Sequence, residues 1–109
     1  MLINVKTKDK TQAEIYIKEW KIGMELIVAI CDSELIGKKF NEGKLTIDIK
    51  GSFYGNTKVS LEYGLERLKK ATIANIVGEK IVNAAISEGL IPRDSIIFID
   101  GIPHAQVIR

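Results

Sequence analysis

Cysteine, histidine and proline are scarce in this 109-residue sequence, and several functional signatures are missing with them. The single cysteine, Cys31, excludes an intrachain disulfide and a thiolate-rich zinc site. Because there is also one histidine, His104, and no HExxH or paired-aspartate pattern, the sequence predicts no metal and no cofactor. The glycines never form a GxxxxGK or GxGxxG phosphate loop.

No apolar run approaches the roughly 18 residues that a membrane-spanning helix needs. The first residues also lack the basic, apolar and small-residue segments of a secretory signal, so we expect a cytoplasmic protein. The balance of 46% hydrophobic and 28% charged residues is typical of a folded chain and predicts one domain over residues 1–109. Frequent isoleucine and lysine with little glutamine give a thermophile-like composition.

The charges are nearly balanced, with a formal net charge of +2. Their distribution is uneven, since residues 1–70 hold 13 Lys and Arg against 10 Asp and Glu, whereas residues 71–109 hold 3 against 4. This bias is weaker than the basic signature of a dedicated nucleic-acid-binding protein. It nevertheless concentrates the lysines in the first two thirds of the chain.

Alternating apolar and polar residues predict several strands. In the strand expected over residues 13–20, the side chains of Tyr16, Lys18 and Trp20 fall on the outward side. Further strands are expected over residues 1–7, 24–31, 44–50, 95–99 and 105–108. Loops are expected over residues 38–43 and 51–57.

Capping residues predict where helices begin. Asp32 should cap the single helical turn that follows it, and Ser60 should cap a helix over residues 61–71. Thr72 is another candidate cap and predicts a second helix over residues 73–88. Early strands and late helices indicate an α+β fold with two layers. We expect a mostly antiparallel or mixed sheet of five or six strands, with two main helices packed on one face.

Four polar residues form a candidate functional cluster: Asn75, Glu79, His104 and Gln106. Asn75 and Glu79 would lie one turn apart on the second predicted helix, and His104 and Gln106 share a face of the last strand. A small-ligand or enzymatic site there is one hypothesis. The alternatives are a solvated helix face and a His104 ring bonded to a backbone carbonyl of its own fold, which we favour.

Cys31 and His104 could also form a nucleophile and base, with Asp32 or Asp100 orienting the ring. However, Cys31 lies in an apolar run, where a cysteine is usually an inert small hydrophobe, so we favour the structural interpretation. No catalytic residue is assigned, and the pattern favours a protein that is not an enzyme.

A candidate surface for RNA or a partner combines basic residues with an aromatic one. Its residues are Lys38, Lys39, Tyr54, Arg67, Lys69 and Lys70. The alternative is that Tyr54 folds back onto the core and that the lysines are ordinary surface residues.

Four segments together resemble the archaeal family catalogued as domain of unknown function 424. They are Cys31-Asp-Ser-Glu-Leu-Ile-Gly-Lys38, Phe53-Tyr54-Gly55, Ala71-Thr-Ile-Ala-Asn-Ile-Val-Gly-Glu79 and Gly101-Ile-Pro-His-Ala-Gln106. The resemblance covers roughly residues 22–108. It implies a small, cytoplasmic α+β protein without an established catalytic activity to carry over. The residues that match the family are Asp32, Gly37, Phe53, Tyr54, Gly55, Asn75, Gly78, Glu79, Gly101, Pro103, His104 and Gln106.

Three functional hypotheses follow from these patterns. The first is a non-enzymatic RNA- or ribosome-associated protein of archaeal translation, suggested by the basic first two thirds and the aromatic loop. The second is the small-ligand or enzymatic site around His104. The third is a homodimeric protein-interaction module that uses an open sheet edge.

Overall fold

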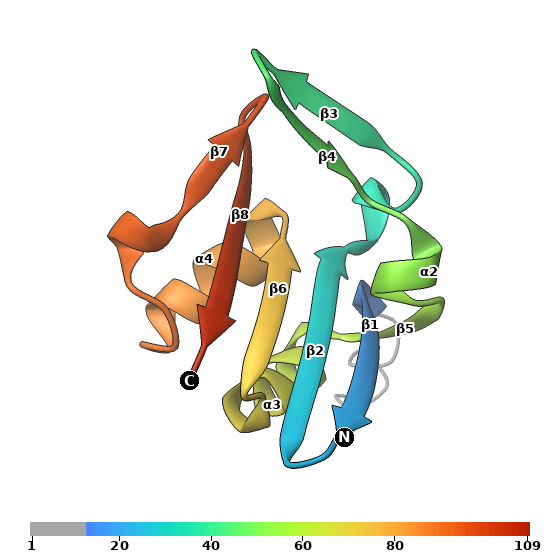
Figure 1. Cartoon of the computed structure of the whole chain (residues 1–109), viewed down its shortest axis with the longest axis vertical. Helices are drawn as coiled ribbons and strands as arrows, with labels where there is room; N and C mark the ends of the chain where they lie inside the picture. Colours follow the sequence, from blue (N-terminus) through green and yellow to red (C-terminus); the bar gives the residue numbers. More distant parts are fainter. Residues whose placement is uncertain (1–12) are drawn as a thin grey trace, which may run out of the picture.

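The computed structural model describes residues 13–109 and has the expected α+β architecture (Figure 1). Six strands form a mixed sheet in the order β5-β1-β2-β6-β8-β7. Their bounds are β1 (Ala13–Ile22), β2 (Glu25–Asp32), β5 (Thr57–Ser60), β6 (Ile73–Val77), β7 (Ile97–Ile99) and β8 (Ile102–Ile108). Neighbouring strands are antiparallel except β2 and β6, which are parallel. The strand expected over residues 1–7 lies outside the described residues.

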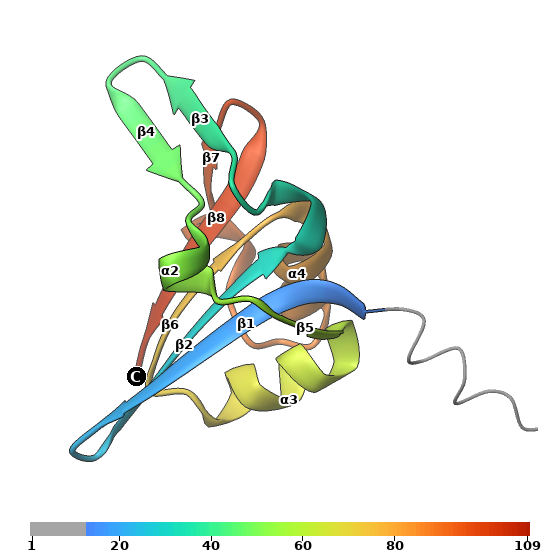
Figure 2. The same ribbon diagram turned by 90° about the vertical axis from the view of Figure 1, so that its right-hand side faces the viewer.

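Two main helices cover one face of this sheet, as the sequence predicted. These are α3 (Leu61–Lys70) and α4 (Glu79–Ser87), which lie together behind the strands (Figures 1 and 2). The short helix α2 (Gly51–Tyr54) and a two-stranded sheet of β3 (Lys39–Glu42) and β4 (Leu45–Asp48) lie toward the other face. Single turns of 3₁₀ helix span Ser33–Leu35 and Arg93–Ser95. Between residues 13 and 109, no helix is both long and apolar enough to span a membrane.

The predicted helix over residues 73–88 is wrong in its first part, because residues 73–77 form strand β6. Three of those five residues are β-branched, and the strand alternates side chains between two covered faces. Thr72 does not cap a helix. Its hydroxyl accepts a hydrogen bond from the Leu26 N–H at 2.9 Å and donates one to the Leu26 carbonyl at 3.1 Å, which ties the start of β6 to β2.

Other predicted elements are confirmed or corrected in their detail. Ser60 caps α3 as expected, since its hydroxyl oxygen accepts a hydrogen bond from the Tyr63 N–H at 3.1 Å. The loops expected over residues 38–43 and 51–57 are wrong, because the first contains β3 and the second contains α2. Strand β3 forms through pairing with β4, a partner that the local sequence pattern does not reveal.

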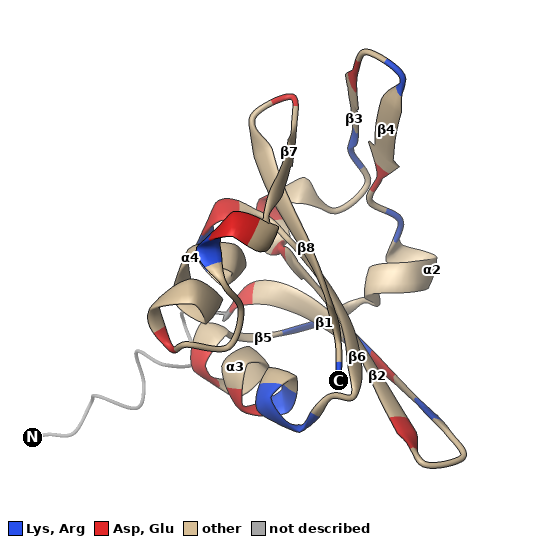
Figure 3. Ribbon diagram, turned by 60° about the vertical axis from the view of Figure 1, so that its left-hand side comes forward, with Lys and Arg blue, Asp and Glu red and all other residues tan. Residues whose placement is uncertain are grey.

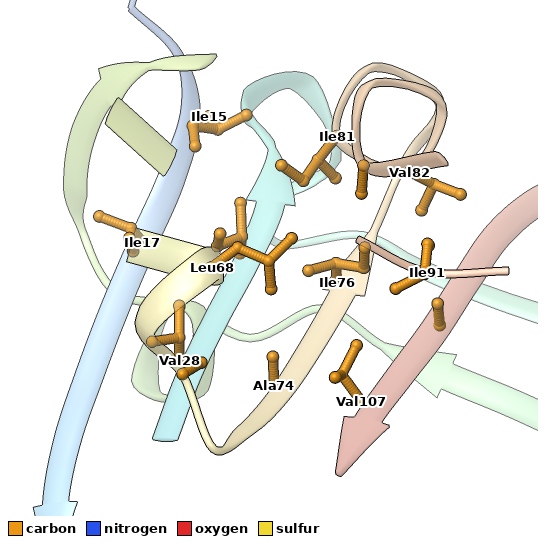
Figure 4. Close-up of a cluster of buried hydrophobic side chains, with 14 residues drawn as sticks. Ile15, Ile17, Val28, Leu68, Ala74, Ile76, Ile81, Val82, Ile91 and Val107 are labelled. Carbon is orange, nitrogen blue, oxygen red and sulfur yellow. The ribbon is translucent and has the colours of Figure 1, made fainter. Parts of the chain in front are cut away.

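Apolar side chains fill both sides of the sheet. The larger cluster lies between the sheet and the two main helices (Figure 4). It includes Ile15, Ile17, Val28, Leu68, Ala74, Ile76, Ile81, Val82, Ile91 and Val107. A second cluster lies on the other face and joins the upper part of the sheet to α2 and β4. Its buried members are Ala29, Cys31, Leu35, Ile47, Ile49, Tyr54, Val77 and Ile99.

Asp32, at the end of β2, fixes the position of α4. Its side chain is 1% exposed, and its carboxylate accepts hydrogen bonds from the N–H groups of Lys80 at 2.8 Å and Ile81 at 3.0 Å. The sequence assigned this cap to the turn after Asp32, but that turn has no side-chain cap. Gly78 permits the close approach, because its φ is 117° and a Cβ there would overlap the Asp32 carboxyl group.

Replacing Asp32 with alanine should lower the free energy of unfolding by about 1–3 kcal/mol, because buried N–H groups of α4 would lose their acceptor. Urea unfolding followed by circular dichroism measures the change. Asp94→Ala is the matched control, since Asp94 is exposed and its loss should cost no more than about 0.5 kcal/mol. Equal stability of the two variants would contradict the capping role.

Candidate functional site

The sheet face away from α3 and α4 is covered only in part, and its side chains lie in cross-strand rows. The middle row contains Lys18, Ala29, Asn75 and Gln106, which are register partners on β1, β2, β6 and β8. The lower row contains Trp20, Ile27, Ile73 and Ile108 by the same register. We call these two rows the open face. Figure 1 views this side of the sheet, with the helices behind it.

Three of the four residues in the candidate cluster come together on this side of the sheet. Asn75 is half-buried and lies directly opposite Gln106, which is exposed. His104 lies two residues before Gln106 on β8, and therefore on the same side. Glu79 is separated from them, because it begins α4, which packs against the opposite face (Figure 2). Asn75 and Glu79 do not share a helix stripe.

Burial lowers the pKa of His104 below its ordinary value of 6.5, so the ring is neutral at pH 7. The ring lies opposite Val77 on one side and Ile97 on the other. The favoured hydrogen bond to a backbone carbonyl is not present among residues 13–109. His104 is therefore an apolar-flanked imidazole at the border of the open face.

Cys31 is fully buried in the second apolar cluster. Burial raises the pKa of its thiol to about 12, and the nearby Asp32 charge adds to the shift. The side chain is therefore a thiol without nucleophilic character at neutral pH, in keeping with the structural interpretation. The described part of the chain also has no group of three or more His, Cys, Asp or Glu side chains that could hold a metal ion.

The residues of the candidate basic surface do not gather in one place. Tyr54 is buried at 4% exposure, and burial raises its pKa to about 12, so its ring belongs to the core. Arg67 is held by Glu19, with its Nε 2.7 Å and its NH2 nitrogen 2.9 Å from the two carboxylate oxygens. Lys69 lies 3.4 Å from a Glu66 carboxylate oxygen.

The remaining lysines of that surface are also dispersed. Lys70 ends α3 on one face of the sheet, whereas Lys38 and Lys39 lie at the start of β3. Figure 3 shows the basic end of α3 far from the hairpin of β3 and β4. The six residues cannot contact one short ligand together.

A different aromatic and basic group lies beside the open face. The rings of Trp20 and Phe53 are 5.3 Å apart, and Lys18 Nζ lies 5.2 Å from the Trp20 ring centroid. Lys58 Nζ lies 5.8 Å from the ring centroid of Tyr16, which is two residues before Lys18 on β1 and points to the same side of the sheet. The alternation in β1 had placed Tyr16, Lys18 and Trp20 on one side. The sequence pattern gave no sign that α2 would bring Phe53 to Trp20.

A groove of about 760 Å³ opens away from His104. It lies beside β1, and its lining includes Lys18, Glu19, Gly55, Asn56 and Thr57. This position does not favour a small-ligand site built on the candidate cluster.

The profile of a family described as "Protein of unknown function (DUF424)" matches residues 21–109. The chain belongs to this family. A solved structure with the same fold is described as an uncharacterized conserved protein from Methanopyrus kandleri, an archaeon. It is 21% identical, with a TM-score of 0.73 over 88% of this chain and 94% of the other. No curated protein matches the sequence. The family carries no assigned activity, so a function has to be argued from the surface of this molecule.

The free energy of unfolding should depend on pH through the protonation of His104. Folding lowers the pKa of His104 below 6.5. At pH values between the folded pKa and 6.5, the unfolded chain therefore binds more protons than the folded chain. The free energy of unfolding should be highest above this window and fall as pH drops through it. Urea titrations at a series of pH values should show this slope, and His104→Gln should reduce it. NMR of the single histidine reports the folded pKa directly, and a value at or above 6.5 would contradict the prediction.

Proposed function

We propose that this protein binds single-stranded RNA on its open face, as a cytoplasmic, non-enzymatic component of RNA or ribosome assemblies. The observation that supports this most directly is the group of Lys18, Trp20 and Phe53 at one end of the open face, with the register partners Asn75 and Gln106 at the other end. Unstacked bases bind aromatic rings, and lysines bind the phosphates that connect them. Side-chain amides can hydrogen-bond the exposed edges of the bases.

The dimensions of the face suit a short segment of nucleic acid. Neighbouring strands lie about 4.8 Å apart, so the middle row from Lys18 to Gln106 spans three such spacings, or about 14 Å. Ala29 within the row is fully buried, but Lys18, Asn75 and Gln106 are half-buried or exposed, and a row of this length has room for more than one base. Trp20 and Phe53 stand at one end of it, and the two amides stand at the other.

Lys18 can serve this role while it supports the fold. Its ammonium donates a hydrogen bond to the Ser52 carbonyl at 2.8 Å, which holds α2 against β1. An ammonium has three donors, so two remain for a phosphate. Lys58 supplies a second charge on the same side of β1. Each phosphate neutralised on a single strand contributes about −0.7 to the slope of log K against log salt, so two lysines predict a slope near ~−1.4.

Trp20 provides the test, because it is the single tryptophan of the chain. Adding a mixed-sequence single-stranded RNA at low salt should quench its fluorescence as bases stack on the ring. Labelled RNA in an anisotropy titration should bind Trp20→Ala about 5–150-fold more weakly, which corresponds to ~1–3 kcal/mol per stacked base. Phe98→Ala is the control, since Phe98 is an aromatic residue 58% exposed on β7 and lies opposite Pro103, on the side of the sheet away from the open face.

Two outcomes would overturn this proposal. One is that no RNA binds at low salt, with neither quenching nor a change in anisotropy. The other is an equal loss of affinity in Trp20→Ala and Phe98→Ala, because RNA would then not distinguish the open face from the opposite face of the sheet.

A further inference from the structure

Half of strand β1 has a free edge. Strand β5 pairs with β1 only between Ala13 and Ile17, whereas β2 pairs with it as far as Ile22. On the side away from β2, the backbone of residues 18–22 therefore has no strand partner within the described part of the chain. Unpaired N–H and C=O groups at a sheet edge are a template for another strand.

We propose that a second copy of this chain pairs with this edge, with the two segments 18–22 antiparallel about a twofold axis. A twofold interface uses the same surface of both copies, so the segment must be complementary to itself. Trp20 is the central residue of the segment, and an axis through it lets all five residues pair.

The charges in the segment favour this register over its neighbours. In an antiparallel pair, two directly opposed residues point to the same side of the sheet. A twofold axis must therefore pass through a residue position, and that residue lies opposite its own copy. An axis at Glu19 would oppose two glutamates, and an axis at Lys21 would oppose two lysines. With the axis at Trp20, Glu19 of each copy opposes Lys21 of the other. Glu19 also accepts hydrogen bonds from Arg67 of its own chain, so it would lie between two cationic side chains. Opposite charges across strands stabilise the pair, and like charges destabilise it.

The same register accounts for exposed apolar side chains at the end of the β1–β2 hairpin. Ile22 is 61% exposed and Met24 is 93% exposed. Ile22 would lie opposite Lys18 of the second copy, and the hairpin tip would continue toward the point where β5 begins. The groove of about 760 Å³ opens at that point, lined by Gly55, Asn56 and Thr57. Met24 of each copy would enter the groove of the other copy.

This assembly would join two six-stranded sheets into one, with both open faces on the same side. It is independent of whether RNA binds there. The helices α3 and α4 of both copies would cover the opposite side. The arrangement therefore leaves the candidate cluster residues Asn75, His104 and Gln106 accessible in each copy.

Light scattering of the unmodified chain should give twice its mass of 12.1 kDa at micromolar concentration. Trp20→Cys should then form a disulfide-linked dimer under mild oxidation, because the two cysteines would oppose each other across the axis. Ile22→Cys is the matched control on the same strand and the same side. Its two cysteines would lie about 14 Å apart along the strands, beyond the ~7 Å reach of a disulfide. The native Cys31 is buried and does not compete.

Charge exchange tests the register without changing Trp20. Lys21→Glu places glutamates opposite each other and should be monomeric. Glu19→Lys combined with Arg67→Glu places lysines opposite each other while it keeps opposite charges at positions 19 and 67, and it should also be monomeric. Mixing the two variants should restore a dimer, whereas Lys44→Glu, a control on the exposed turn between β3 and β4, should remain dimeric. A monomeric unmodified chain would overturn the proposal. Equal crosslinking of the two cysteine variants, or a mixture that stays monomeric, would overturn it as well.

Discussion

The bond between the Asp32 carboxylate and the first turn of α4 is the constraint on which the arrangement of the sheet depends. Asp32 follows Cys31, whose partner across the parallel pair is Val77, and Gly78 then turns the chain into α4. One buried carboxylate thus joins the ends of two parallel strands to the start of a helix. Burial raises the pKa of Asp32, while the N–H groups of Lys80 and Ile81 act in the opposite direction. The hydrogen bonds offset part of the cost of burying this charge.

The position of α4 determines why the two faces of the sheet differ. Alongside α3, it covers Ile30 and Ile76 from one side, and both side chains are fully buried there. On the other side, the β3–β4 hairpin lies toward the upper end of the strands, and α2 covers part of β1, where the Ser52 carbonyl accepts a hydrogen bond from Lys18 and Phe53 packs on Trp20. The other members of the middle and lower rows are half-buried or exposed, although Ala29 in the middle row is fully buried.

Family membership and fold similarity leave the function to be argued from this surface. The relative from Methanopyrus kandleri has the same fold, but at 21% identity that likeness concerns the fold alone. The informative features are local ones: an aromatic pair, lysines over aromatic rings, two facing amides and a half-free edge strand. All of them lie on or beside the part of the sheet that the helices leave uncovered.

The sequence by itself determined the elements whose signals are local. Alternation fixed the two sides of β1, and Ser60 with its following leucine stripe fixed α3. Composition and element order were enough to predict the α+β class. The sequence also identified Asn75, His104 and Gln106 as unusual polar groups, although it placed Asn75 on a helix.

Tertiary structure decided the rest, because the decisive contacts come from distant parts of the chain. Residues 73–77 are apolar enough for a helix or a strand, and pairing with β2 and β8 selects the strand. Asp32 caps a helix whose first bonded residue, Lys80, is 48 positions away, which no local capping pattern reveals. The contact of Phe53 with Trp20 likewise depends on how α2 packs. Local periodicity determines the faces of an element, whereas the partners of those faces are determined only when the whole chain folds.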